Sequence, residues 1–222
     1  SSTLPKGSNS YFFSSAGITT IVSDIFTMPS FINFAKIRAS IAQTGNDADP
    51  YNLTQTYTSS VGGNGVIINR DSRLPISNLK PEITTSQEAG IDLRLFDSRI
   101  NVEFTWFNSN SKNQLLPVTL PAASGWSSEF INAGNVKNSG IELTVGGKII
   151  KQSDFKWDMS VNYSKNTNEV LEISPTLNEF VIGAGDFMNT VKVIKGKPYG
   201  ELYSRGYTRN ATGKIVVDAN GL

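Results

Sequence analysis

Hydrophobic and polar residues alternate in five stretches of the chain. In residues 155–164, FKWDMSVNYS, every odd position is apolar or aromatic and every even position is polar. A similar alternation runs through residues 34–42, 86–96, 99–108 and 140–149. Because successive side chains of an extended strand point to opposite faces, each stretch has one apolar face and one polar face. No stretch sustains the apolar spacing of an amphipathic helix, so the pattern predicts an all-β protein.

The connections between these stretches are of two kinds. Short turns are expected at residues 28–30, 95–100 and 150–154. Residues 44–83, 110–138 and 165–187 are rich in Gly, Asn, Ser, Thr and Pro and are predicted to be loops. Weaker strand patterns occur in residues 11–20, 188–195, 199–208 and 214–217. In an antiparallel meander, alternate connections lie at opposite ends of the sheet. One end of the sheet is therefore expected to carry the short turns and the other the long loops; we call the second the elaborated end.

The alternating stretches are longer than most strands of soluble proteins. They persist for about 9–11 residues, which is the length that a tilted strand needs to cross a bilayer. A closed barrel would then be required, because an open edge leaves backbone groups unpaired in hydrocarbon. The predicted lipid-facing residues are Ile91, Leu93, Val102, Phe104, Leu143, Trp157, Met159 and Val161. Phe155, Trp106 and Tyr163 lie near strand ends, as in the aromatic belts of membrane barrels.

The opposite face carries charges of both signs, which suits a water-filled lumen. These residues are Lys36, Arg38, Glu88, Asp92, Arg94, Glu103, Glu142, Lys148 and Asp158. The alternative is a soluble, secreted β-sheet domain with one wet face, which would bind glycans or mediate adhesion through its loops. Cell fractionation distinguishes the two, since a barrel wall follows the outer membrane.

Composition excludes several functions. The 222 residues carry a formal net charge of +1 and include no Cys and no His. Nucleic acid is therefore not an expected partner, and disulfides, thiolate chemistry and Ser-His-Asp catalysis are excluded. Acidic residues are distributed along one face instead of converging as a glycosidase pair would, so no catalytic residue is predicted. No apolar run approaches a transmembrane helix, and SSTLPKGSNS at residues 1–10 lacks the charged and apolar regions of a signal peptide, so none is expected within these residues.

Two motifs resemble those of a known family. LKPE at residues 79–82 and TSQEAG at 85–90 resemble the LxPE…ExG pattern of TonB-dependent outer-membrane receptors. NAGNVKNSGIE at residues 132–142 is similar to the start of a later barrel strand in these receptors. The wider runs NFAKIRASIAQTGN, QLLPVTLPAASGWSSEFINAGNVKNSGIEL, DFKWDMSVNYSKNTNEV and GKPYGELY resemble the SusC/RagA branch of the family. This resemblance extends from about Phe12 to the end of the chain.

The resemblance implies an antiparallel meander that forms part of a large transmembrane β-barrel, 22-stranded in the family. Such receptors import oligosaccharides or peptides across the bacterial outer membrane with energy from TonB. A SusD/RagB-like surface lipoprotein closes over the extracellular mouth. Residues 1–222 are expected to form a segment of the barrel wall, without the plug domain that leads to TonB, the early strands or the C-terminal strand. We expect such a segment alone to transport nothing.

Candidate cargo-binding residues follow from the predicted lumen and loops. Glu88, Asp92 and Arg94 face the predicted lumen, and Trp126 and Tyr51 lie in predicted extracellular loops. For the charged residues the alternative is ordinary pairing between neighbouring strands, and for Trp126 it is packing within its own loop. Residues 46–50, NDADP, place oxygens at alternate positions as a calcium loop does, but they lack the Gly and the distant Glu of an EF-hand. No cofactor is otherwise expected.

Overall fold

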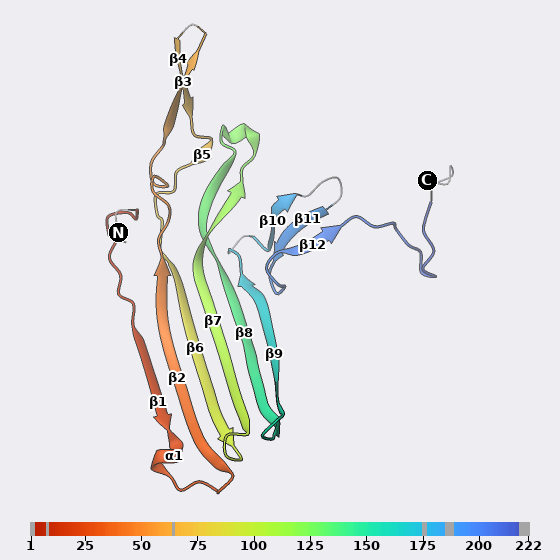
Figure 1. Cartoon of the computed structure of the whole chain (residues 1–222). Coiled ribbons are helices and arrows are strands. Elements are labelled where there is room, and N and C mark those ends of the chain that lie inside the picture. Colours follow the sequence, from red (N-terminus) through yellow and green to blue (C-terminus); the bar gives the residue numbers. More distant parts are fainter. Residues whose placement is uncertain (1–2, 8, 64, 175–176, 185–188, 218–222) are drawn as a thin grey trace.

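The computed structural model describes residues 3–7, 9–63, 65–174, 177–184 and 189–217. Six long strands form an antiparallel meander (Figure 1): β1 Ser15–Ile21, β2 Ile32–Asn46, β6 Glu82–Leu95, β7 Ile100–Thr119, β8 Ser128–Lys151 and β9 Lys156–Glu172. Each pairs with the next in that order, which confirms the all-β class and the meander. Of the described helices, none is long and apolar enough to cross a membrane.

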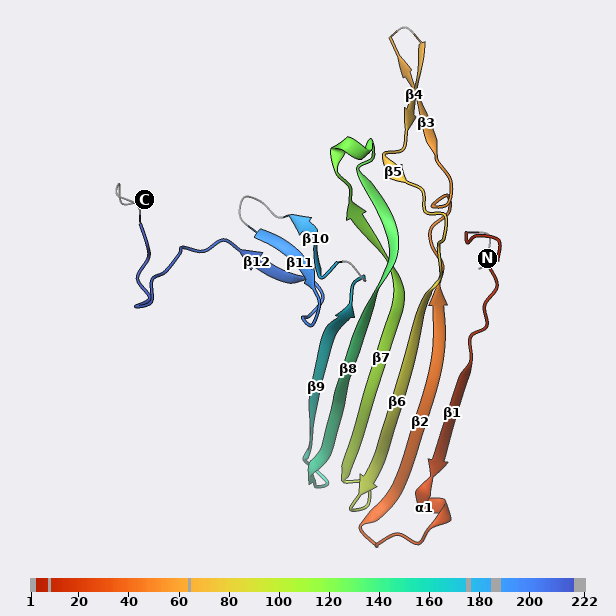
Figure 2. The same cartoon turned by 180° about the vertical axis from the view of Figure 1, so that it is seen from behind.

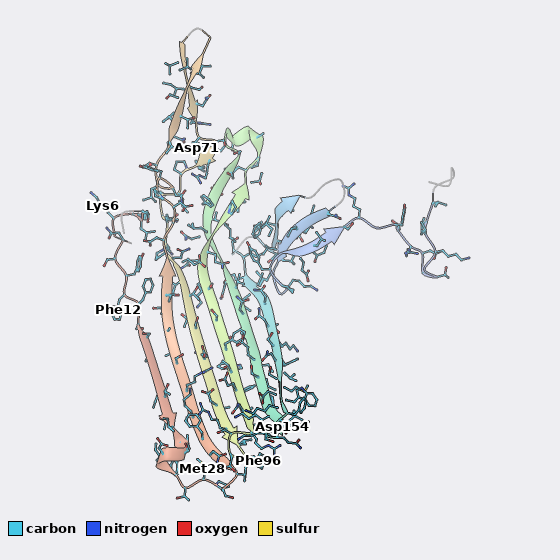
Figure 3. The ribbon with its side chains drawn as sticks, in the orientation of Figure 1. Lys6, Phe12, Met28, Asp71, Phe96 and Asp154 are labelled. Atoms are coloured by element: carbon cyan, nitrogen blue, oxygen red, sulfur yellow. The ribbon has the colours of Figure 1, made fainter. Side chains whose placement is uncertain are left out.

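The short connections gather at one end of the sheet, where Figure 3 labels Met28, Phe96 and Asp154. The turn between β6 and β7 is unusual because three consecutive non-glycine residues, Phe96–Ser98, have positive φ. Asn33 stabilises this turn, since its Oδ1 accepts hydrogen bonds from the backbone N–H groups of Asp97 at 2.6 Å and Ser98 at 3.3 Å. The connection between β1 and β2 includes one helical turn, α1 Val22–Ile25, that the sequence did not predict.

Strand register joins the alternating stretches into two continuous faces. One row across five strands contains Ala35, Leu93, Val102, Val145 and Val161. The next row contains Lys36, Asp92, Glu103, Thr144 and Asn162. The half of the sheet next to the short turns is the lower sheet, and the half next to the long connections is the upper sheet. In the lower sheet, one face carries the odd residues of β2, β6, β8 and β9 and the even residues of β7. We call it the apolar face and the opposite one the polar face.

The apolar face is not covered by a second layer of the described chain. Val161 is 52% exposed, Ile37 47% and Trp106 41%, although each belongs to an apolar row. A soluble sandwich would bury such rows against a second sheet. The described residues instead form a single curved layer through this part of the molecule (Figures 1 and 2).

The elaborated end differs from the prediction that residues 44–83, 110–138 and 165–187 are loops. That prediction was wrong in large part, because β7 continues to Thr119, β8 begins at Ser128 and β9 continues to Glu172. Polar residues such as Asn108 and Ser139 pair along these extensions, since the ladder needs only backbone groups. Within the first segment, β3 Tyr57–Gly62 and β4 Gly65–Arg70 form a hairpin that projects beyond the sheet (Figure 1), followed by β5 Arg73–Leu74.

The C-terminal part agrees in part with the predicted strands. It forms a separate three-stranded sheet: β10 Glu179–Ala184, β11 Asn189–Ile194 and β12 Glu201–Ser204. β11 and β12 lie within the strands predicted at residues 188–195 and 199–208. Residues 185–188, of which 188 belongs to a predicted strand and 185–187 to a predicted loop, lie outside the described residues. The strand predicted at residues 214–217 is reduced to one isolated bridge between Arg209 and Ile215.

Two buried apolar clusters hold the elaborated end together. The first contains Leu116, Val136, Val170, Ile173 and Val193 and joins the upper sheet to β11. The second contains Leu4, Ala48 and Leu79 and anchors the segments on either side of the β3–β4 hairpin. Both use residues outside the alternating rows of the lower sheet, so among the described residues the clusters of buried apolar side chains lie at the elaborated end.

Candidate functional site

A charged network occupies the polar face of β2 and β6. Lys36 forms an ion pair with Asp92, and Arg38 lies 3.5 Å from Glu88 and 3.7 Å from Asp92. Arg38 also donates a hydrogen bond from Nη2 to Thr105 Oγ1 at 2.7 Å, which extends the network to β7. Asp92 is 9% exposed, so the network neutralises a buried carboxylate.

The predicted lumen-facing candidates therefore lie together on one face. Glu88 and Asp92 belong to the network just described, and the Arg94 guanidinium stacks 4.9 Å from the centroid of the Phe34 ring. These partners are provided by the neighbouring strand, as the alternative interpretation expected. Cargo contact by these residues stays a prediction.

The predicted lipid-facing residues all share the apolar face by strand register and alternation: Ile91, Leu93, Val102, Phe104, Leu143, Trp157, Met159 and Val161. On β9 the apolar positions run from Trp157 to Tyr163, and Phe155 precedes them at the short turn, so the band spans residues 155–163. Nine residues at about 3.3 Å each, tilted by about 40°, cover about 23 Å, close to the band of membrane barrels. Phe31 and Phe96 add a stacked aromatic pair, with centroids 5.9 Å apart, at the short-turn end.

Two long connections of the elaborated end are clamped to each other. Arg70, at the end of β4, lies over the Trp126 ring at 4.0 Å from its centroid and donates a hydrogen bond to the carbonyl of Gly125. Nearby, Ser127 donates its backbone N–H to the carbonyl of Ser72 at 2.8 Å. Trp126, a predicted cargo platform, thus has one face occupied by a cation of the same chain. Its role in cargo binding stays a prediction for the other face.

The elaborated end also contains a groove of about 640 Å³, lined in part by Asp47, Ala48, Asp49 and Asn52 of the connection that follows β2. Residues from the upper parts of β2, β6, β7, β8 and β9 line it, together with Tyr199 from the connection before β12. Its hydrogen-bonding side chains are Asn46, Asp47, Asp49, Asn52, Glu82, Gln114, Asn138, Asn168 and Tyr199. The described lining includes three carboxylates and no Lys or Arg, so the groove is acidic.

Several groove side chains are held in place by neighbours. Tyr11 donates its phenolic O–H to Asp47 Oδ1, and this hydrogen bond raises the pKa of Tyr11. Asn168 donates to Asn138 Oδ1 at 2.7 Å and accepts the backbone N–H of Tyr199 at 2.6 Å. Burial raises the pKa of Tyr199, so its phenol remains a proton donor at neutral pH.

Asn52 differs from the other groove residues. It is 5% exposed, and its Oδ1 has no hydrogen-bond partner. A buried acceptor without a partner is costly, which makes it the most notable polar atom of the groove.

Calcium binding by residues 46–50 stays a prediction. Within the described part of the chain, no three Asp or Glu side chains approach closely enough to hold a metal ion together. Tyr51, the other loop candidate, is 73% exposed and has a φ of 68°. Cargo contact by Tyr51 stays a prediction.

Sequence reasoning did not identify the groove as a site. Glu82 was singled out as a motif residue, but its position opposite Asn46 depends on the register between β6 and β2. Asn138, Asn168 and Tyr199 come from distant parts of the sequence and meet only after folding. Two signals were available: the alternating oxygens of residues 46–50, which provide Asn46, Asp47 and Asp49 of the groove, and the abundance of Asn in segments predicted as loops.

Comparison with known proteins agrees with the geometry. The family described as TonB dependent receptor-like, beta-barrel matches residues 2–207. TonB-dependent receptor P3 of Formosa agariphila is 30% identical over 93% of this chain, and receptor P39 of the same organism is 36% identical over 78%. TonB-dependent receptor SusC of Bacteroides thetaiotaomicron is 28% identical over 65% of the chain. The aligned regions span 22%, 16% and 14% of the lengths of these relatives, respectively.

A solved structure shares the fold. The RagAB peptide importer in its closed-closed state superposes with a TM-score of 0.81 over 99% of this chain and 26% of that chain, at 20% identity. The three relatives from Formosa agariphila and Bacteroides thetaiotaomicron are named as TonB-dependent receptors. Membership of a β-barrel receptor family disfavours the alternative of a soluble, secreted β-sheet domain. The chain belongs to the TonB-dependent receptor-like β-barrel family, in its SusC/RagA-like branch, and is an outer-membrane β-barrel protein.

Proposed function

We propose that this chain forms part of the wall of an outer-membrane transporter that imports oligosaccharides or peptides. The eight predicted lipid-facing residues, which lie in the apolar rows between Ile91 and Val161, face acyl chains. The polar face lines the path of the cargo. The elaborated end, with the β3–β4 hairpin and the groove, faces the cell exterior.

One observation carries this proposal. Strand register aligns apolar side chains across five strands on one exposed face and charged side chains on the opposite face. A protein in water would gain free energy by covering the apolar rows, whereas a bilayer provides that cover without a second layer. A water-filled barrel interior equally favours the charged network.

The partners follow from the family and from the position of the elaborated end. A SusD/RagB-like surface lipoprotein would close over that end, where the clamped connections provide a broad and fixed surface. TonB would supply energy through regions of the receptor beyond the segment matched here. The fold shared with a peptide importer is compatible with peptide cargo, and oligosaccharide cargo remains the second alternative of the proposal.

Uptake measurements test the proposal. A strain without the receptor that contains this chain should lose energy-dependent uptake of one cargo class from a mixture of labelled oligosaccharides and peptides. The full-length receptor should restore uptake, and a protonophore should abolish it. Unchanged uptake of every cargo in the deletion strain, with the receptor expressed in the wild type, would contradict the proposal.

A further inference from the structure

The acidic groove has the chemistry of a binding site with a defined preference. We propose that it binds an ammonium group carried by the cargo. This inference rests on the proposed transport function and names a chemical feature of what is transported. An ammonium group occurs both on lysine-containing peptides and on glucosamine-containing oligosaccharides, so the experiment below includes both sources.

Charge is the first argument. Asp47, Asp49 and Glu82 line the groove, and the described lining contributes no positively charged side chain. In the lower polar face, by contrast, Lys36 and Arg38 neutralise the carboxylates of Glu88 and Asp92. Asp49 and Glu82 form no ion pair with a Lys or Arg among the described residues, unlike Glu88 and Asp92 on the same face, and a ligand cation would provide such a partner.

The unpartnered acceptor is the second argument, and it is independent of charge. Asn52 lines the groove, is 5% exposed, and has an Oδ1 atom without a hydrogen-bond partner. Glu82 accepts only a long contact from Gln114, at 3.5 Å. Acceptors in excess call for a ligand rich in donors, and an ammonium group has three donors and no acceptor.

The geometry favours an organic cation over a metal ion. The described residues provide no group of three carboxylates close enough to coordinate a metal. Tyr199 and the apolar side chains of Leu115 and Phe130 also line the groove, so it can contact carbon skeletons as well as charge. A cavity of about 640 Å³ accommodates two or three sugar or amino-acid units instead of a bare ion.

Calorimetry on the full-length receptor in detergent tests the inference. The probes are trilysine, fully deacetylated chitotriose, its N-acetylated neutral form and triglutamate. We expect trilysine or deacetylated chitotriose to bind at least about tenfold more tightly than the neutral and anionic probes, and the better of the two identifies the source of the ammonium group. Equal affinity for the neutral form, or binding of Ca²⁺ alone, would overturn the inference.

Variants locate the binding to the groove. Glu82→Gln and Asp49→Asn should each weaken binding of the cationic probe by about tenfold, whereas Asp24→Asn, an exposed carboxylate in α1 at the opposite end of the sheet, should leave it unchanged. Asn52→Leu should weaken binding while preserving or raising thermal stability, because it removes an unpartnered buried acceptor. Unchanged affinity in both Glu82→Gln and Asn52→Leu would overturn the assignment.

The same variants separate this inference from the proposed function. If uptake of cargo persists in cells while cationic probes fail to bind the purified receptor, the groove inference is overturned and transport stands. If the deletion strain shows no uptake defect, transport itself is contradicted whatever the groove binds.

Discussion

The Arg38 side chain lies flat across Gly90. A Cβ atom on Gly90 would be 2.6 Å from Nε of Arg38, and the guanidinium continues over β6 to donate to Thr105 on β7. Arg38, Gly90 and Thr105 occupy one row of the polar face by register. The glycine of the ExG motif is therefore the position that lets one charged side chain cross a whole strand.

Replacing this glycine should disturb the crossing. Gly90→Ala is expected to cost about 1–3 kcal/mol, because the guanidinium must move away from Thr105 to make room. Urea unfolding of the receptor refolded in bilayers measures the change. Gly146→Ala is the matched control, since Gly146 is on the same face and its added Cβ would meet nothing within 4 Å. Equal costs for the two variants would contradict the steric explanation.

Adjacent residues of β9 test which face meets lipid. Val161 and Ser160 are both exposed, and they point to opposite faces at the middle of the apolar band. Val161→Arg should cost about 2–4 kcal/mol on refolding into bilayers, whereas Ser160→Arg should cost far less because it faces water. The lipid assignment fails if the two substitutions are equally costly.

The Arg70–Trp126 contact should couple the two long connections. Arg70→Met and Trp126→Leu each remove it, and a double-mutant cycle should show a coupling of about 0.5–2 kcal/mol. Hydrogen exchange of residues 120–128 provides the measurement, because loop opening need not alter global unfolding. Additive effects would show that the ring and the guanidinium are neighbours without mutual stabilisation.

The base of the β3–β4 hairpin should loosen in acid. The backbone N–H of Arg73 donates to Asp71 and, with a hydrogen bond from Thr56, holds the pKa of Asp71 below its usual value of 3.8. Because the folded pKa is the lower one, its stabilising contribution is present above pH 3.8 and is lost as pH falls through the folded pKa.

Protease sensitivity of residues 56–73 should therefore rise as pH falls below 3.8, as measured with an acid-active protease. Asp71→Asn removes the titrating group, and in this variant the sensitivity should no longer change over that range. If residues 56–73 of the wild-type protein stay equally protected from the protease over this pH range, ionised Asp71 does not stabilise the start and end of the hairpin.

The local sequence determined the strands of the lower sheet, their two faces and their short turns. Alternation at period two is a property of each strand alone, so Trp157, Met159 and Val161 could be assigned to one face without knowledge of their neighbours. The motifs at residues 79–90 and 132–142 likewise identified the family before any pairing was known.

Only the tertiary structure decided what happens at the elaborated end. The upper parts of β7 and β8 are rich in polar residues and lack the alternating pattern. They become strands because backbone groups find partners in register, which side-chain patterns do not reveal. The groove has the same origin, since Asn52, Glu82 and Tyr199 are distant in sequence and are brought together by pairing. The alternation of apolar and polar residues within one strand indicates which of its faces meets lipid and which meets water. A site built from several strands forms only when the register between those strands is fixed.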